Sequence, residues 1–298
     1  MLRRTFLAAL AAAGALPGQG QQQDPPFRLP SSVRLDKDQV YASPGGRDLH
    51  LDLFRPRSGG GPFPAIVFVH GGGWRSGSRT QFHRQAAHMA TKGFVGACIE
   101  YRLSGEEKWP ACIDDCKASV RWFWENQYRL NVNPRRIGAA GGSAGGHLAA
   151  LMGTTQRRDS FGSHMEHPGP SSKVSAVAAF NGVFDVTALA EAIPGHVERY
   201  FVPLFGATPE QNPSVYREAS PATYVGKSTP PFLLLHGTAD TTVPYEQAVA
   251  FEKLMKADGC DVELFTAEGA GHGFFNAPPW YDKTLAAMEA FFVRTLKG

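Results

Sequence analysis

The sequence predicts an α/β protein in which a mostly parallel central sheet is covered by helices on both faces. Short apolar runs such as 64–69 and 231–237 alternate with helical stretches such as 111–130, which is typical of strands joined by crossover helices. The runs are nearly continuous, which indicates strands that are buried on both faces. With 298 residues, 43% of them hydrophobic and 19% charged, the chain is expected to form one domain over 41–298.

The first residues are expected to be a targeting segment. Arg3 and Arg4 precede an apolar run at 6–16 that is followed by small residues, which is the pattern of a signal peptide over 1–20. The arginine pair resembles a twin-arginine signal, so a bacterial protein exported to the periplasm or the medium is expected. The run is too short to span a bilayer as a helix, and no integral membrane anchor is expected. Residues 21–40 are interpreted as a linker.

The charge balance gives no reason to expect a nucleic acid or an anionic membrane as a partner. Lys and Arg number 30 against 27 for Asp and Glu, and two of the arginines lie in the expected signal peptide. The mature chain is therefore close to neutral, which leaves no strong electrostatic attraction to a polyanion.

The four cysteines match no zinc-binding pattern. Cys112 and Cys116 lie one helical turn apart, where the geometry for a disulfide is poor. They are expected to be buried free thiols, and so is Cys260 before the last strand. A bridge from Cys98 to the helix that carries the first two remains an alternative. No metal or organic cofactor is implied.

A His-Gly-Gly-Gly-Trp run at 70–74 follows the apolar strand at 64–69. Glycine has no Cβ, so the backbone N–H groups of such a run can approach a substrate oxyanion closely. His70, which opens the run, is expected to be a structural hydrogen-bonding residue.

A serine between glycines follows the next buried run, at 136–140. The sequence Gly-Gly-Ser-Ala-Gly at 141–145 lets a strand turn sharply into a helix, here expected at 144–152, because the residues two before and two after the serine approach too closely for side chains. The turn holds the hydroxyl of Ser143 out of the sheet edge in a strained backbone conformation. With the glycine run upstream, it predicts a serine hydrolase.

A serine hydroxyl needs a base to accept its proton, and the base needs an acid that orients it. Asp240 follows the strand expected at 231–237, and His272 follows the strand expected at 262–266, with a helix at 245–257 between them. Both side chains lie past the carboxyl ends of strands, where open α/β sheets place their ligands. The order serine, acid, histidine also agrees with the known order for this kind of turn.

Asp185 is the alternative acid, because it follows the strand expected at 174–180. It is expected instead to cap the helix at 186–192. His147, one turn into the helix after the serine, is expected to pack or to support the site, and His236 is expected to be structural. Surface positions are expected for five other histidines: His83, His88, His164, His167 and His196.

The segment 157–230 is where substrate specificity is expected to lie. Residues 159–172 have the composition of a loop, whereas 193–213 contain aromatic and apolar residues among prolines. The segment is interpreted either as an acyl-binding wall that includes Phe205 or as a surface excursion packed on the sheet. Because it is short, the site is expected to be open, which suits a bulky or polymeric alcohol group.

These motifs together resemble the α/β-hydrolase esterases, and in particular a bacterial feruloyl-esterase-like branch related to the hormone-sensitive-lipase-like carboxylesterases. The resemblance is carried by the run at 70–74, by Glu-Tyr-Arg-Leu at 100–103, by Gly-Gly-Ser-Ala-Gly-Gly-His at 141–147 and by the loops of Asp240 and His272. It covers about 41–296 and implies an α/β-hydrolase fold with a short cap insertion after the sixth strand. Trp74 departs from the Phe or Tyr common in the hormone-sensitive-lipase branch.

The resemblance also implies roles for individual residues. Ser143 would be the nucleophile, His272 the general base and acid, and Asp240 the residue that orients His272. The oxyanion donors would be backbone N–H groups: those of Ala144 and of Gly72 or Gly73. Three further residues are expected to contact the substrate: Trp74, His147 and Phe205.

The sequence therefore predicts a serine carboxylic-ester hydrolase that acts on acetyl or feruloyl esters of plant polysaccharide, or on short-chain esters. An arylformamidase-like amide hydrolase, which also uses a His-Gly-Gly-x-Trp loop, remains an alternative. A serine peptidase of the prolyl-oligopeptidase type usually carries a large gating domain, for which this chain has no room. A binding module without activity would not need Ser143, Asp240 and His272 together. The oligomeric state is not indicated.

Overall fold

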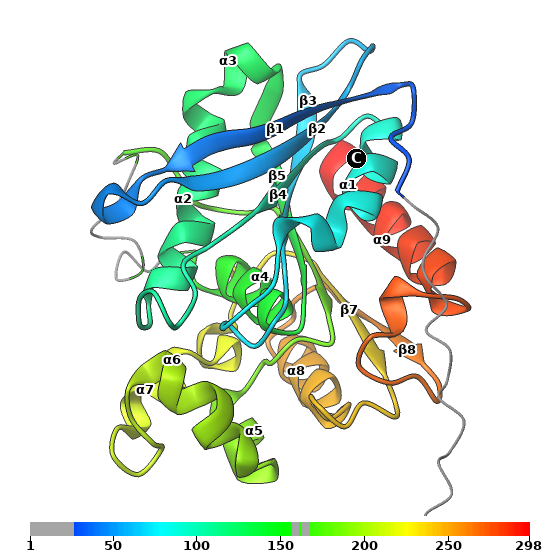
Figure 1. Cartoon of the computed structure of the whole chain (residues 1–298). Helices are drawn as coiled ribbons and strands as arrows, with labels where there is room; N and C mark the ends of the chain where they lie inside the picture. Colours follow the sequence, from blue (N-terminus) through cyan, green and yellow to red (C-terminus); the bar gives the residue numbers. More distant parts are fainter. Residues whose placement is uncertain (1–26, 157–160, 162–166, 168) are drawn as a thin grey trace, which may run out of the picture.

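The computed structural model of the protein describes residues 27–156, 161, 167 and 169–298, and its centre is an eight-stranded sheet. The strand order is β1-β2-β4-β3-β5-β6-β7-β8 (Figure 1). The β1–β2 and β2–β4 pairs are antiparallel and all the others are parallel, so the predicted mostly parallel sheet is confirmed. The strands are β1 (Val33–Ala42), β2 (Leu49–Pro56), β3 (Phe63–Val69), β4 (Val95–Ile99), β5 (Val132–Gly142), β6 (Ala176–Phe180), β7 (Phe232–Gly237) and β8 (Val262–Ala267).

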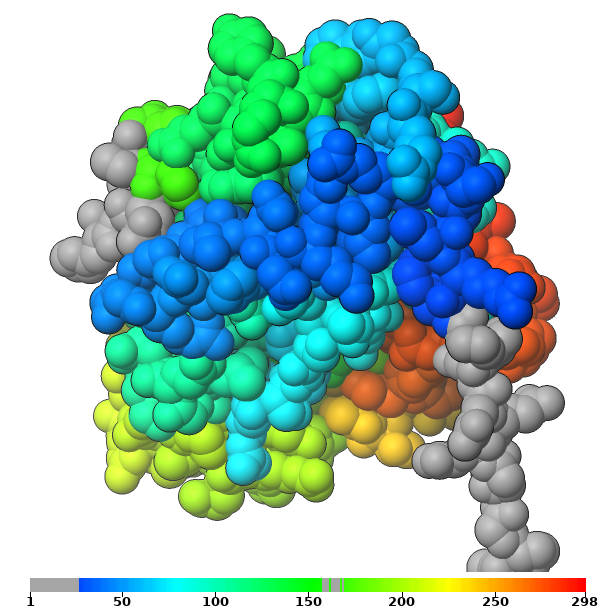
Figure 2. All heavy atoms as spheres, turned by 45° about the horizontal axis from the view of Figure 1, so that its top comes forward, coloured from blue at the N-terminus to red at the C-terminus, as the bar shows by residue number. Residues whose placement is uncertain are grey.

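The folded domain begins earlier than the sequence predicts. Residues 33–40 were expected in a linker but belong to β1, which pairs with β2 at one edge of the sheet. Only the ends of this strand are buried, at Val33 and at Tyr41 and Ala42, and three of the four exposed positions between them are charged. An edge strand of this composition has no apolar run to indicate it. Figure 2 shows the N-terminal strands as a blue band across one face of the molecule.

The signal peptide expected over residues 1–20 lies outside the described residues and stays a prediction. In the described ranges, every helix is too short or too polar to cross a lipid bilayer.

Helices cover both faces of the sheet. On one face α2 (Ala111–Glu125), α4 (Ala144–Thr154) and α8 (Glu246–Ala257) pack over strand residues that include Val67 and Val69 of β3. On the other face α1 (His83–Thr91) and α9 (Trp280–Lys297) pack over alternate residues, among them Ile66 and Phe68. Because successive side chains of a strand point to opposite faces, burial of both faces requires an unbroken apolar run.

The single helix expected over 111–130 is two helices in the structure. α2 ends at Glu125, and the short α3 (Gln127–Leu130) follows directly. At the junction the side chain of Asn126 donates to the carbonyl oxygen of Trp122 and accepts from Arg129. Side-chain hydrogen bonds of this kind compete with helical ones and favour an end to the helix.

The chain between β6 and β7 forms the cap insertion. Its elements lie beside one another below the carboxyl ends of the central strands (Figure 1). They are α5 (Val186–Ala192), the single-turn η3 (Val197–Phe201), α6 (Val202–Phe205), α7 (Pro213–Glu218) and η4 (Pro221–Tyr224). Asp185 caps α5, as predicted, because its carboxylate accepts the backbone N–H of Ala188 at 3.0 Å.

All four cysteines are free thiols. Cys98, Cys112 and Cys116 are buried, whereas Cys260 is only half-buried. The alternative of a bridge between Cys98 and α2 is therefore wrong, and burial raises the pKa of the Cys112 thiol, which keeps it protonated.

Candidate active site

Ser143 lies at a sharp turn between β5 and α4. Its backbone has φ 57° and ψ −122°, a conformation that is strained for any residue other than glycine. A Cβ at Gly141 would clash with the carbonyl of Gly145, and one at Gly145 would clash with the carbonyl of Val69. The two outer glycines therefore allow β5, α4 and β3 to approach one another closely. This approach holds the serine hydroxyl at the carboxyl end of the central strands.

A chain of hydrogen bonds runs from Ser143 to a buried carboxylate. The Oγ of Ser143 lies 2.9 Å from Nε2 of His272, and Nδ1 of His272 lies 2.7 Å from Oδ2 of Asp240. The Asp240 side chain is fully buried, and the His272 side chain is 27% exposed. An imidazole held in this way by a carboxylate can accept a proton from the serine hydroxyl.

The loop after β7 keeps Asp240 ionised. Burial raises its pKa, but hydrogen bonds from His236 and His272 and from backbone N–H groups outweigh that effect and hold the pKa well below the ordinary range. The backbone donors are Thr242 and Val243, at 2.8 and 3.0 Å from Oδ1. His236, expected to be structural, is buried with Nε2 3.3 Å from Oδ2 of Asp240.

The glycine run at 70–74 lies next to the serine. The N–H of Gly71 donates to the side chain of Gln81, and Gly72 and Gly73 line the pocket in front of Ser143. Among the described residues, the N–H groups of Gly72 and Gly73 have no hydrogen-bond acceptor. Ala144 is the first residue of α4, where an N–H has no partner within the helix. The structure thus places all three expected donors on free backbone nitrogens beside Ser143.

Asn181, which follows β6, links the serine to the histidine and was missed in the sequence. Its Oδ1 accepts the backbone N–H of Ser143 at 3.2 Å, and its Nδ2 donates to the carbonyl oxygen of His272 at 2.6 Å. The residue has a positive φ of 39°, which asparagine tolerates better than most residues do. A polar residue at the end of a strand was the one available signal for it.

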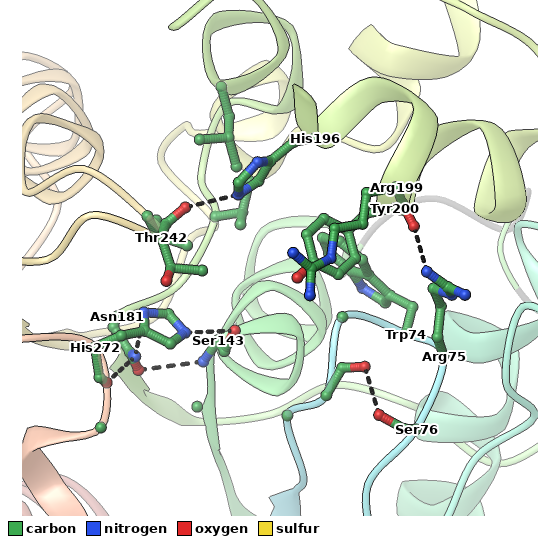
Figure 3. A pocket seen from close by; sticks show the side chains of 18 of the residues that line it. Trp74, Arg75, Ser76, Ser143, Asn181, His196, Arg199, Tyr200, Thr242 and His272 are labelled. Atoms are coloured by element: carbon green, nitrogen blue, oxygen red, sulfur yellow. Dashed lines mark hydrogen bonds between the residues drawn. The ribbon is translucent and has the colours of Figure 1, made fainter. Parts of the chain in front are cut away.

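These groups open into a pocket of about 580 Å³, a usual size for a small-molecule site (Figure 3). One side of the pocket is formed by the glycine run at 70–74 (the glycine loop), the turn at Ser143 and the loop of His272. The other side is formed by cap residues such as Leu189 and Tyr200. The interpretation of the cap as a wall of the site therefore holds, and the alternative of a separate surface excursion does not.

Trp74, one of three expected substrate contacts, lines this pocket, but the other two do not. His147 is completely buried under Trp74: its Nδ1 accepts the indole N–H at 3.2 Å, and its Nε2–H donates to the carbonyl of Ala219. Phe205 points away and packs against Trp109 and Tyr216. The prediction of substrate contact is wrong for both, because each side chain fills the space beneath the pocket wall.

Two histidines that were expected at the surface lie in the pocket or in the interior instead. His196 lines the pocket, and its ring lies 3.0 Å from the carbonyl oxygen of Thr242. His83 is buried against the carboxylate of Asp52. His164 lies outside the described residues. Tyr200 belongs to the aromatic segment 193–213 in which a wall of the site was expected, whereas three other pocket residues had no signal in the sequence: Arg75, Gln81 and Arg199.

Similar proteins of known name or structure include several esterases. The esterase LipC of Mycobacterium tuberculosis is 35% identical over 219 residues, which make up 72% of this chain but only 53% of LipC. A thermophilic esterase of Thermogutta terrifontis, Est2, has a solved structure that is 33% identical, covers 89% of this chain and 92% of its own, and gives a TM-score of 0.73. A bifunctional GH43-CE protein of Bacteroides eggerthii is 29% identical over 88% of this chain and 35% of its own, with a TM-score of 0.79.

This chain therefore spans about half the length of LipC, and it spans 58% of the related mycobacterial protein LipM. The BD-FAE family model matches residues 51–255, which hold both the glycine run and the turn at Ser143. From this match and the observed sheet, the chain belongs to the BD-FAE family of α/β hydrolases.

Proposed function

We propose that the protein is a serine carboxylic-ester hydrolase. The observation that carries the proposal is the hydrogen-bonded chain of Ser143, His272 and Asp240, whose first two members line the pocket. In this arrangement Ser143 is the nucleophile, His272 the general base and acid, and Asp240 the residue that orients His272 and stabilises its charged form.

The reaction proceeds in two steps. The Oγ of Ser143 attacks the ester carbonyl as His272 Nε2 takes its proton, and the backbone N–H groups of Gly72 or Gly73 and of Ala144 donate to the oxyanion. His272 then protonates the leaving alcohol, so that an acyl-enzyme remains. In the second step His272 removes a proton from a water molecule, which attacks the acyl-enzyme. His272 then returns that proton to the Oγ of Ser143 as the bond to the acyl group breaks, so that the acid is released and the enzyme is restored.

Relatives in sequence and in structure support the proposal of a serine ester hydrolase. Several are named esterases or carboxylesterases, among them NlhH of Mycobacterium tuberculosis, which is 28% identical over 91% of this chain and 85% of its own length. Structures of the Thermogutta terrifontis esterase have been solved bound to butyrate and phosphorylated by paraoxon. Phosphorylation by an organophosphate is the behaviour expected of an activated serine.

We further propose that the substrates are acetyl or feruloyl esters of plant polysaccharide, or short-chain esters. The pocket of about 580 Å³ holds a short acyl group together with an aromatic ring or a single sugar. The family of the chain and the GH43-CE protein among its structural relatives favour a carbohydrate ester over a lipid. This step is an analogy between folds and needs its own test.

The first experiment compares kcat/KM on p-nitrophenyl acetate, p-nitrophenyl octanoate, methyl ferulate, acetylated xylan and an aryl formamide. Turnover of acetylxylan or ferulate well above the generic esters supports a carbohydrate esterase, whereas activity on the formamide alone replaces the ester hydrolase with an amide hydrolase. Ser143→Ala is expected to lose nearly all activity and to keep its thermal unfolding transition. Full activity in that purified variant would exclude Ser143 as the nucleophile.

Reaction with paraoxon gives a readout that does not depend on the natural substrate. Ser143 is expected to gain one diethylphosphoryl group, detected by mass spectrometry of the intact protein and located by peptide mapping. The Ser143→Ala variant is the control. Label on another residue, or none in the wild type, would contradict the proposed nucleophile.

A further inference from the structure

Two arginines line the pocket on the side away from His272: Arg75, just after the glycine run, and Arg199 in η3 (Figure 3). Neither forms an ion pair with any carboxylate in the described parts of the chain, whereas other arginines do. Arg102 pairs with Asp115 at 2.7 Å, for example, and Arg55 pairs with Asp36 at 2.8 Å. The two pocket guanidinium groups are thus cations without a counter-charge from the described chain.

The described residues that line the pocket also include no aspartate and no glutamate. The carboxylate of the catalytic assembly, Asp240, is fully buried behind His272 and is already shared with its donors. Trp74 and Phe201 contribute apolar surface to the wall of the pocket. A cleft lined by charges of one sign and walls of low dielectric focuses the field and attracts a ligand of opposite charge.

Contacts between the cap and the glycine loop hold both arginines in place. A Cβ at Gly73 would lie only 2.6 Å from the ring of Tyr200, so the absence of a side chain there lets that ring pack onto the loop. The guanidinium of Arg199 lies over the same ring, 5.2 Å from its centre. Arg75 donates through Nη1 to the backbone carbonyl of Arg199 at 2.7 Å.

These contacts leave most N–H donors of the two side chains available. A guanidinium has five N–H donors in a planar fork that matches a carboxylate in two-point contacts. Arg75 uses one of them in the bond to the cap, and Arg199 donates to no acceptor in the described residues. Because both groups are positively charged and line the same pocket, an anion bound there would be attracted by both.

The neighbouring His196 is affected by the same positive field. Burial lowers its pKa most, and the positive charge of Arg199 lowers it further. His196 therefore stays neutral at pH 7, with its Nε2–H on the carbonyl of Thr242, and adds no charge of its own to the wall.

We propose that the ester hydrolysed at this site carries a free carboxylate, which Arg199 and Arg75 bind. The inference rests on the proposed function and specifies its substrate class: an acidic ester, with the carboxylate on either the acyl or the alcohol group. Charge-assisted hydrogen bonds to a guanidinium give the carboxylate both affinity and a fixed orientation over Ser143.

The test uses two matched pairs of esters that differ only in this charge. Mono-4-nitrophenyl glutarate and its amide analogue place the charge on the acyl side, and 4-acetoxybenzoate and 4-acetoxybenzamide place it on the alcohol side. In Arg199→Gln and Arg75→Gln, kcat/KM for the acidic member of one pair is expected to fall about 10- to 100-fold more than for its amide, mainly through KM. Added salt should weaken the wild-type preference for the acidic member.

Arg136→Gln is the matched control, because it removes the same charge from an exposed position in β5 outside the pocket. It is expected to leave both members of each pair unchanged. Equal losses on acidic and neutral esters in the two pocket variants would overturn the inference, and so would a wild type that treats both members of both pairs alike. A wild type inactive on all four esters would instead contradict the proposed function.

Discussion

The side-chain oxygen of Gln81 accepts the backbone N–H of Gly71 at 2.7 Å. Gln81 belongs to η2 (Arg79–Phe82), the single turn that follows the glycine loop, so the bond ties the start of the loop to the element after it. The N–H of Gly71 is thereby occupied, and the next two N–H groups are left for a substrate oxygen. Gln81 is a positioning residue for the proposed oxyanion site.

Replacement of Gln81 by methionine should therefore slow catalysis. The variant keeps the size of the side chain but leaves the N–H of Gly71 without an acceptor, so the loop loses its fixed orientation. We expect kcat on p-nitrophenyl acetate to fall about 10-fold with little change in KM, because an oxyanion donor acts mainly in the transition state. Gln39→Met, in β1, is the control, and an equal kcat in the two variants would contradict this role.

The two candidate carboxylates can be separated by one matched substitution. Asp240→Asn leaves an amide beside Nδ1 of His272 and favours the wrong tautomer of the ring, so kcat is expected to fall about 10,000-fold. Asp185→Asn retains a capping side chain on α5 and should keep nearly the wild-type kcat. Steady-state kinetics of both variants decide the assignment, and a large loss in Asp185→Asn would reverse it.

His147 should make the stability of the protein depend on pH. Burial lowers its pKa to about 4, against 6.5 for an ordinary histidine, so the unfolded chain binds a proton more readily between these values. The neutral ring therefore makes its full contribution to the free energy of unfolding above about pH 6.5. This contribution is lost as the pH falls toward 4, and the whole loss is about 3 kcal/mol.

Urea unfolding at pH 7 and pH 4.5 measures this effect. Between the two pH values the wild type is expected to lose about 2 kcal/mol more of its free energy of unfolding than His147→Gln does, because the variant has no group that titrates there. Other titrating groups contribute equally to both proteins. An equal loss in the two proteins would show that His147 does not remain neutral in the folded state.

Features that depend on short-range backbone geometry could be predicted from the sequence. The turn at Ser143 requires glycine where α4 approaches β5 and β3, and the steric reason is visible in five consecutive residues. The continuous apolar runs likewise predicted the buried parallel strands. The edge strand β1 could not be predicted, because its exposed, charged middle carries no pattern that distinguishes it from a linker.

The sequence could not show which side chains of the cap reach the pocket. Phe205 and Tyr200 lie five residues apart in one aromatic segment, yet only Tyr200 faces the site. The wide π-helical turn of η3 and the short α6 decide which of them points inward, and both elements pack against α7 or the glycine run at 70–74. Asn181 and Gln81 were missed because their partners lie on other segments.

The sequence by itself determined the order of the elements, the nucleophile turn, the glycine loop and the candidate acid and base, because each depends on local sterics or on the end of a strand. Only the tertiary structure decided that Asn181 bridges Ser143 and His272, that His147 supports Trp74 from below, and that Arg75 and Arg199 share one wall. These relationships join segments that are far apart in the chain. Their geometry follows from how the cap packs on the sheet, which no local pattern of residues specifies.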